Sequence, residues 1–217
     1  MNQSHKQFLN LSDEVKLLNK NIKIIVVTKS QSLENFVSLI RLGHLDFGEN
    51  RVQETKKKWS NVLTVNSKLN LHLIGHLQTN KVTDAISLFN YIHTLDSEKL
   101  ALALSNEEKR KNRKIKYFIQ INVGEESQKT GIELRHLKSF KEYCLHELQL
   151  NIIGLMCIPP AKLDSFIFFK KLATIAKQEN LYELSMGMSD DYKTAIQCGS
   201  TYLRIGRAIF GERALNN

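Results

Sequence analysis

Cysteine and proline are scarce in this chain of 217 residues, and neither marks a familiar kind of site. The cysteines Cys144, Cys157 and Cys198 do not form the close pairs that bind zinc, and an odd number of isolated thiols is typical of a reducing compartment. The two prolines are adjacent, and no proline-rich or glycine-rich linker divides the chain. We therefore expect one cytoplasmic domain that spans residues 1–217.

Long apolar runs are also absent from the sequence. No stretch approaches the roughly 20 apolar residues that a membrane-spanning helix needs. The segment MNQSHKQFLNLSDEVKLLNK mixes charges with an amphipathic pattern and has no apolar core followed by small residues, as a signal peptide would. We expect this segment to form a helix, and we expect no membrane among the partners of the protein.

Negative charge is in short supply, because 31 Lys and Arg residues face 22 Asp and Glu residues, for a net charge of +9. A basic surface favours an approach to phosphates, so nucleic-acid binding is one interpretation. The lysines are spread through most helical stretches, however, and the densest cluster, residues 109–116, lies where a helix should end before a strand. We favour a solvated basic surface and expect no nucleic acid as a partner.

Short β-branched runs alternate with longer amphipathic stretches, a pattern typical of βα units around a parallel sheet. An open doubly wound sheet would normally carry a glycine-rich phosphate loop after its first strand, but VVTKSQSLENF contains no glycine. We predict a (β/α)8 barrel, also called a TIM barrel, with one extra helix at the N-terminal end. The predicted strands are residues 23–28, 44–47, 71–75, 91–95, 116–123, 152–157, 182–186 and 202–205, and helical patterns cover 33–42, 79–89, 97–111, 134–148, 163–178 and 190–199.

Functional residues of such barrels lie at the carboxyl ends of the strands, so the residues directly after each apolar run matter most. Ser189 and Gly206 follow the seventh and eighth runs, where barrels often bind phosphate, although the serine could cap a helix and the glycine could serve a tight turn. Lys29 follows the first run, where a lysine usually extends into water. If its amine is partly desolvated beside other cations, its pKa falls and it can attack an aldehyde. A phosphate site beside a lysine nucleophile predicts a phosphorylated carbonyl compound.

Several motifs in chain order resemble the pyridoxal phosphate homeostasis protein family, the single-domain relatives of the alanine racemase barrel. This barrel is fold type III among the folds that bind pyridoxal phosphate. The match covers nearly the whole chain, and the ordered set is far more specific than any one motif. The motifs are VVTK at 26–29, FGEN at 47–50 followed by Val52, Gln53 and Glu54, IGHLQTNK at 74–81, the spaced Asn122, Glu126, Lys129 and Gly131, GLMCIPP at 154–160, LSMGMSDD at 184–191 and GSTYLRIGRAIFGER at 199–213.

This resemblance implies that pyridoxal 5'-phosphate (PLP) is bound covalently as a Schiff base on Lys29. It also implies that Ser189 and the backbone amides of Gly206 and Arg207 hold the phosphate group. Many relatives have threonine or serine where this chain has Arg207, so one hydroxyl contact to the phosphate is lost here. The loop SQSLEN also lacks the proline often found shortly after the lysine, which affects the stiffness of the loop more than its chemistry.

The remaining pocket residues implied by the resemblance are Arg204, which would face the pyridine nitrogen, and Asn50, His76 and Met156, which would line the pocket. An arginine donates a hydrogen bond to an unprotonated nitrogen, whereas an acidic partner would keep the nitrogen protonated. The ring is therefore expected to be a weak electron sink, and we assign no catalytic residue.

Two histidines four residues apart, His72 and His76, could suggest a metal site. On a strand that rises roughly 3.3 Å per residue they would lie about 13 Å apart, which is too far for one metal ion to bridge. No cysteine lies in a recognisable Cys-His-Asp spacing either. We expect neither a metal nor nucleophilic hydrolysis.

Three functions remain to be compared. We favour a non-catalytic PLP carrier that stores, delivers or buffers PLP in intracellular vitamin B6 homeostasis, as a monomer, with apo forms of PLP-dependent enzymes as recipients. The alternative enzyme is a PLP-dependent amino-acid racemase with weak activity. Racemases of this fold take a second base from an added β domain and a dimer partner, and we assign Tyr192 to a helix rather than to that role. The third class, a nucleic-acid binder, rests on charge alone.

Overall fold

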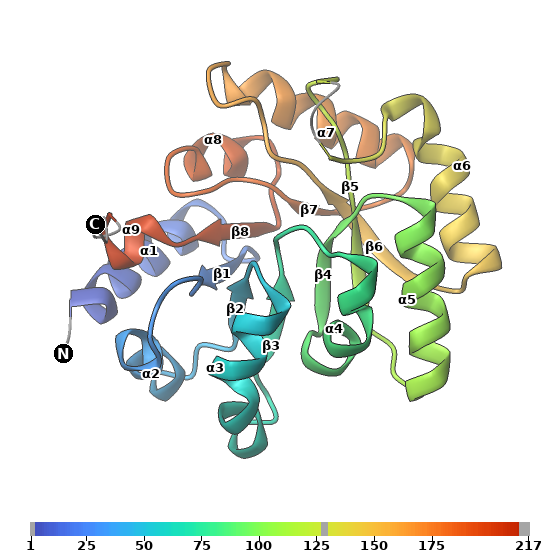
Figure 1. The fold of residues 1–217 in the computed structure, drawn as a ribbon. Coiled ribbons are helices and arrows are strands. Elements are labelled where there is room, and N and C mark those ends of the chain that lie inside the picture. Colours follow the sequence, from blue (N-terminus) through green and yellow to red (C-terminus); the bar gives the residue numbers. More distant parts are fainter. Residues whose placement is uncertain (1–2, 127–129, 213–217) are drawn as a thin grey trace.

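The computed structural model describes residues 3–126 and 130–212 and contains a closed barrel of parallel strands. The strands follow one another around the barrel in chain order, and β8 pairs with β1 to close it (Figure 1). The predicted (β/α)8 barrel is therefore confirmed. The strands are β1 (Lys23–Val27), β2 (Asp46–Glu49), β3 (Asn70–Leu73), β4 (Tyr91–Leu95), β5 (Lys116–Gln120), β6 (Asn151–Met156), β7 (Glu183–Ser185) and β8 (Tyr202–Ile205).

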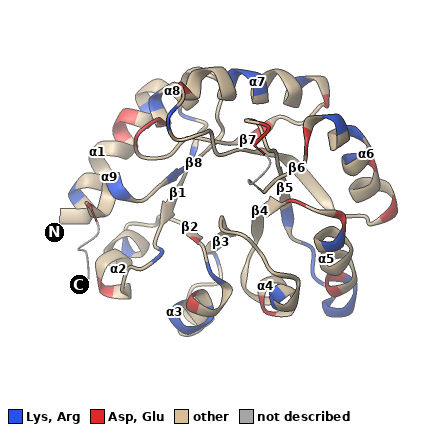
Figure 2. Ribbon diagram, turned by 45° about the horizontal axis from the view of Figure 1, so that its top comes forward, with Lys and Arg blue, Asp and Glu red and all other residues tan. Residues whose placement is uncertain are grey.

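Helices surround the strands, and Lys and Arg residues are spread over most of them rather than gathered on one face (Figure 2). The N-terminal helix α1 forms as expected and packs against α2 and α9. Helices α3 and α9 lie outside the predicted helical stretches. The helices are α1 (Gln3–Leu18), α2 (Leu33–Arg41), α3 (Val52–Val65), α4 (Val82–Leu88), α5 (Glu98–Lys111), α6 (Leu137–Glu142), α7 (Ser165–Gln178), α8 (Tyr192–Gln197) and α9 (Arg207–Phe210), with short helical turns at Thr79–Lys81, Leu134–His136 and Tyr143–Glu147.

Two strand predictions differ most from the structure, whereas the bounds of the other six agree with it to within two residues. The second strand was expected at residues 44–47, but β2 begins at Asp46 and continues through Gly48 to Glu49, because these residues pair in register with β3. Backbone pairing with a neighbouring strand thus outweighs the low strand propensity of glycine. The fifth strand was expected to reach residue 123, but β5 ends at Gln120.

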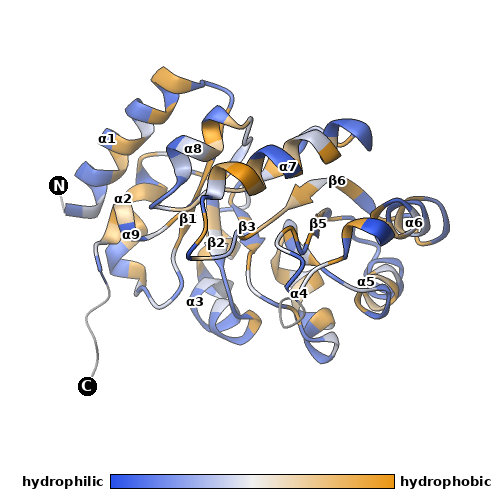
Figure 3. Ribbon diagram, turned by 90° about the horizontal axis from the view of Figure 1, so that it is seen from above, coloured by the Kyte–Doolittle hydropathy of each residue, from blue (hydrophilic) through white to orange (hydrophobic). Residues whose placement is uncertain are grey.

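Apolar side chains divide between the inside and the outside of the barrel wall, because successive residues of a strand point to opposite sides. The larger set packs between the strands and the helices. In Figure 3 the helices accordingly alternate between hydrophobic and hydrophilic residues, whereas β1 and β6 are largely hydrophobic. The smaller set, which fills the barrel interior, consists of Ile25, Tyr91, Phe118, Met156 and Tyr202.

Aromatic rings fix the helices α2 and α3 to the outside of β2. Phe36 of α2 and Trp59 of α3 are stacked, with ring centroids 5.1 Å apart, and the ring of Phe47 lies 5.1 Å from that of Trp59. All three side chains are fully buried. Among residues 3–126 and 130–212, no helix has the length and apolar content to cross a membrane.

Candidate functional site

The eight residues predicted from the sequence all lie toward one end of the barrel, because parallel strands bring their carboxyl ends together. Lys29 is half-buried and follows β1, and Met156 is the buried last residue of β6. The others are Asn50 after β2, His76 after β3, Ser189 after β7, Arg204 within β8, and Gly206 and Arg207 directly after β8.

Arg204 is buried across the ends of three neighbouring strands, with an exposed fraction of only 4%. Its Nη1 donates to the carbonyl oxygen of Ser185 at 2.6 Å and to the Ser185 hydroxyl at 2.7 Å, and its Nη2 donates to the carbonyl oxygen of Cys157 at 2.9 Å. Burial lowers the pKa of Arg204, but a guanidinium stays protonated in a protein. The site therefore contains a fixed, positively charged hydrogen-bond donor.

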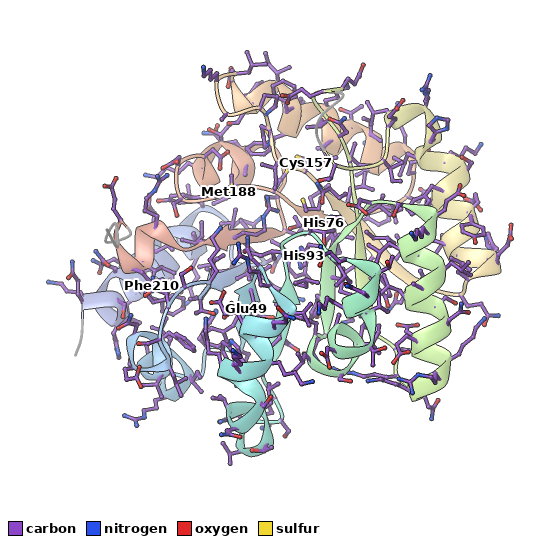
Figure 4. The ribbon with its side chains drawn as sticks, viewed as in Figure 1. Glu49, His76, His93, Cys157, Met188 and Phe210 are labelled. Atoms are coloured by element: carbon purple, nitrogen blue, oxygen red, sulfur yellow. The ribbon has the colours of Figure 1, made fainter. Side chains whose placement is uncertain are left out.

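A hydrogen-bonded chain runs from Arg204 down through the barrel. The Ser185 hydroxyl lies 2.8 Å from His93 Nδ1, His93 Nε2 lies 3.0 Å from His72 Nδ1, and His72 Nε2 lies 3.0 Å from Asp46 Oδ1. Figure 4 shows His93 among the strands at the centre of the molecule. We call these five residues the interior chain. Its far end is a carboxylate at the start of β2.

The interior chain has one direction of donation when both histidines are neutral. Burial lowers the pKa of His93 well below its usual value, and the neighbouring His72 and Arg204 lower it further. Burial also lowers the pKa of His72, against the opposing effect of Asp46. The carboxylate must accept from His72, so His72 accepts from His93, which accepts from the Ser185 hydroxyl. Each member therefore donates away from Arg204, and the guanidinium is fixed as a donor.

The loop after β8 meets the loop after β7 and passes close to the end of β1. A Cβ atom on Gly206 would lie 3.3 Å from both the Cβ and the carbonyl oxygen of Val27, so a residue without a side chain suits this close approach. The Ser189 hydroxyl accepts from the backbone N–H of Ala208 at 3.1 Å. The residues proposed to hold phosphate are thereby joined to each other and lie beside the strand that leads to Lys29.

The structure also shows how Ser189 and Arg207 lie in these loops. Ser189 does not cap α8, because the N-cap residue of that helix is Asp191. The Arg207 side chain is exposed and forms an ion pair with Asp190.

Asn50 and His76 occupy the opposite side of the barrel end. A Cβ atom on Gly75 would lie 2.4 Å from the carbonyl oxygen of Asn50, so glycine allows the loops after β2 and β3 to touch. Asn50 Oδ1 is buried and has no hydrogen-bond partner within the described part of the chain. His76 is exposed, and its Nδ1 lies 3.2 Å from Asp96 Oδ2. An acceptor that is buried without a partner costs about 1–3 kcal/mol, which indicates a place for a ligand donor.

Sequence reasoning missed most of the interior chain. The signal was present in β3 and β4, where His72 and His93 interrupt otherwise apolar runs, but no spacing rule connects them to each other or to Ser185. His72 and His76 do not form a pair, because His72 lies inside the barrel and His76 at its rim. No cluster of three or more potential metal ligands occurs in the ranges 3–126 and 130–212. Lys129, part of a predicted motif, lies outside the described residues.

The arrangement of strands and site defines a barrel of the alanine racemase type. Residues 8–214 match the family described as alanine racemase, N-terminal domain. An alanine racemase from Clostridium difficile 630 has the same fold, with a TM-score of 0.74 at 16% identity, over 99% of this chain and 58% of that chain.

Closer relatives narrow this class. A pyridoxal phosphate homeostasis protein of Vibrio cholerae is 36% identical over 203 residues, which are 89% of this chain and 86% of the relative. PipY of Synechococcus elongatus, solved without PLP, matches with a TM-score of 0.89 at 30% identity, over 97% of this chain and 100% of that chain. PipY with PLP bound matches with a TM-score of 0.85, over 96% and 100%. The chain belongs to the pyridoxal phosphate homeostasis protein family, which confirms the resemblance of its motifs.

Proposed function

We propose that this protein binds PLP as a Schiff base on Lys29 and acts in intracellular PLP and vitamin B6 homeostasis, as a carrier that stores, delivers or buffers the cofactor. The observation that carries the proposal is the match to PLP-bound PipY, which is 30% identical and covers 96% of this chain. The residues needed for such a site also lie together at one end of the barrel.

The residues present fit PLP. The cofactor has a phosphate group, an aldehyde and a pyridine nitrogen, and when bound it supplies an electrophilic carbon and an electron-withdrawing ring. We propose that Ser189 and the amides of Gly206 and Arg207 hold the phosphate, and that Arg204 donates to the ring nitrogen. Asn50 Oδ1, which lacks a partner among the described residues, would gain a ligand donor. His76 and Met156 would complete the pocket wall.

The interior chain supports a carrier rather than an efficient racemase. It holds Arg204 in place, and a guanidinium only donates and stays protonated, so Arg204 does not deliver a proton to a ring nitrogen that it contacts. The Tyr192 hydroxyl donates to Glu14 on α1 at 2.9 Å, which engages the one tyrosine considered as a second acid or base. We propose that turnover of amino acids is absent or weak, and that the cytoplasmic monomer and apo-enzyme recipients expected from the sequence complete this role.

Borohydride reduction tests the covalent site. The protein is loaded with PLP, reduced and digested, and mass spectrometry is expected to locate one pyridoxyl group on Lys29. Lys29→Ala should abolish the adduct, whereas Lys56→Ala, which removes an exposed lysine paired with Asp84, should leave it in place. An adduct on a different lysine in the wild-type protein would contradict the assignment.

Exchange of the α-proton tests the alternative function. Amino acids are incubated with the PLP-loaded protein in deuterated water, and exchange is followed over many protein equivalents. We expect little or no exchange above that of free PLP. Sustained exchange that requires Lys29 would support a racemase-like enzyme instead.

A further inference from the structure

A network of charged side chains lies behind Lys29, on the outer side of the barrel wall, and the proposed PLP contacts do not include it. Glu49 ends β2 and points away from the barrel interior, toward α3, which supplies Glu54 and Lys58. Figure 4 shows Glu49 beside that helix. Lys58 Nζ donates to Glu49 Oε1 at 2.9 Å and to Glu54 Oε1 at 3.0 Å. We call these three residues the outer network.

The outer network binds the residues on both sides of Lys29. Lys58 Nζ also donates to the carbonyl oxygen of Thr28 at 2.7 Å, and the Thr28 hydroxyl donates to Glu49 Oε1 at 2.7 Å. On the other side, the backbone N–H of Ser30 donates to Glu54 Oε1 at 2.7 Å. All three protons of the Lys58 ammonium group are therefore donated in hydrogen bonds, one of them to the backbone carbonyl group of the residue before Lys29.

These contacts fix the direction in which the Lys29 side chain leaves the backbone. A peptide unit is planar, so the backbone at one residue has only two free rotations, one against each adjoining plane. The plane between Thr28 and Lys29 is held through the Thr28 carbonyl oxygen, which accepts from Lys58 and, at 3.0 Å, from the backbone N–H of Gln31. The plane between Lys29 and Ser30 is held by Glu54 through the Ser30 amide. With both planes fixed, the Cα–Cβ bond of Lys29 is fixed as well.

The conformation of Ser30 makes this turn energetically costly, although the backbone N–H of Gln31 closes it onto the Thr28 carbonyl oxygen. Its φ is +59°, in the left-handed region that costs an L-residue other than glycine roughly 1–2 kcal/mol. The Glu54 contact offsets that cost. Glu54 has a lowered pKa: its partial burial opposes ionisation, but the Ser30 amide and Lys58 together outweigh that effect. The network is also rigid, because the Trp59 indole donates to Glu49 Oε1 at 2.9 Å and its ring belongs to the aromatic cluster with Phe36.

We propose that Glu54 and Lys58, supported by Glu49, are positioning residues that set where the Lys29 amine enters the barrel end. The inference rests on the proposed role of Lys29 in PLP binding, and none of the three residues touches the cofactor in that role. Without the network the Thr28–Ser30 turn relaxes, and the amine spends less time in the orientation that meets the aldehyde.

Matched substitutions on one helix separate this role from general stability. Glu54→Ala and Lys58→Met remove the network, whereas Asp84→Ala and Lys56→Met remove an exposed ion pair of the same chemistry, which joins α3 to the first turn of α4. Glu54→Gln keeps an acceptor for the Ser30 amide and serves as the conservative variant.

The first measurement is PLP affinity, obtained by titrating each folded protein with PLP and following the visible absorbance of the lysine-bound cofactor. We expect about tenfold weaker binding for Glu54→Ala and Lys58→Met, since each removes one or more hydrogen bonds to a charged group. Glu54→Gln should recover most of the loss. The two control variants should bind PLP as the wild-type protein does.

The second measurement uses the PLP-free protein. Trace labelling with acetic anhydride over a range of pH gives the reactivity of each lysine by mass spectrometry, with the exposed Lys20 as an internal standard. In Glu54→Ala and Lys58→Met the reactivity of Lys29 relative to Lys20 should differ from that in the wild-type protein. In both control variants the profile of Lys29 against pH should keep the wild-type shape.

The outcomes distinguish the two proposals. Wild-type affinity and a wild-type Lys29 profile in Glu54→Ala would overturn the positioning role, and this variant suffices if Lys58→Met does not fold, because the Glu54 side chain is 31% exposed. A change in thermal stability alone, without a change in the Lys29 profile, would also overturn it. If the wild-type protein forms no adduct on Lys29, the proposed function fails, whereas the labelling of the PLP-free protein still decides whether the network positions the amine.

Discussion

The interior chain and the outer network hold the two sides of the proposed site, and they do so in different electrostatic ways. In the interior chain a single positive charge on Arg204 is separated from Asp46 by three neutral side chains. In the outer network the charges touch directly, because one ammonium group lies between two carboxylates. The hydrogen bonds of the interior chain form only when each histidine has the right tautomer. The ion pairs of the outer network form only when both charged partners are present. The two regions should therefore respond differently to substitution and to pH.

Removing the buried carboxylate of the outer network, Glu49, should have the largest effect on stability. Glu49→Ala leaves Lys58 with one carboxylate and deprives Thr28 and Trp59 of their acceptor. Loss of a partner from a buried ion pair costs about 3–5 kcal/mol, and we expect a loss near the lower figure. Urea denaturation measures it. Glu142→Ala, which removes an exposed partner of Lys141, is the control and should cost under about 1 kcal/mol.

Replacing a neutral residue of the interior chain should lower the free energy of unfolding by less than Glu49→Ala does. His93→Phe keeps a flat ring beside Phe118, whose centroid lies 4.3 Å away, but leaves His72 and Ser185 without their shared partner. The expected loss is about 1–3 kcal/mol by urea denaturation, the range for leaving buried polar groups unsatisfied. A loss larger than that of Glu49→Ala would reverse the comparison between the two regions.

The interior chain and the outer network should lose their contributions to stability at different pH values. His72 and His93 have a folded-state pKa below the usual value of 6.5, so the unfolded chain binds more protons and stability falls as the pH falls below about 6.5. His44 acts in the same direction because it is also buried. Glu54 has a lowered pKa, so its contribution is present above about 4.5 and is lost as the pH falls further.

The effect of the histidines on stability can be estimated per pH unit and tested with a matched variant. Each histidine contributes at most about 1.4 kcal/mol of unfolding free energy per pH unit. Between pH 6.5 and 5, His93→Phe should flatten the slope of stability against pH, whereas Glu54→Gln should leave that slope unchanged and alter it only below about pH 5. His146→Ala, which removes an exposed histidine paired with Glu142, is the matched control. Equal slopes in the wild-type protein and His93→Phe would show that His93 is not held neutral.

Substitution of Arg207 is expected to have the smallest effect on stability and on PLP affinity. Its guanidinium pairs with the exposed Asp190, and an exposed pair contributes about 0–1 kcal/mol. Since only the amide of Arg207 is proposed to meet the phosphate, Arg207→Ala should change PLP affinity by less than about threefold in the same absorbance titration. Ser189→Ala, which removes a proposed phosphate contact, should weaken binding more. The reverse order would place the guanidinium on the phosphate.

The sequence predicted the barrel and the end of it that carries the site, because both depend on local patterns. Each strand is a short apolar run, and the residues directly after a run must lie at the carboxyl end, which located Lys29, Ser189 and Arg204. Their roles toward PLP stay predictions. The two networks escaped this reasoning because they join distant positions: Thr28 to Glu49 across 21 residues, and His93 to Ser185 across 92. Helix α3 lay outside the predicted stretches, and with it the position of Lys58 behind Lys29.

The pairing of β1 with β8 governs when the proposed site comes into existence during synthesis. Lys29 is translated before Gly206, whose backbone meets Val27, and all the other strands of the barrel lie between them in the sequence. Every βα unit between them must be translated before the barrel closes. A chain that is not yet translated through β8 carries Lys29 without Arg204 or the proposed phosphate contacts at Gly206 and Arg207. Cofactor capture would then be a property of the completed barrel, and it would report that the final strand has docked.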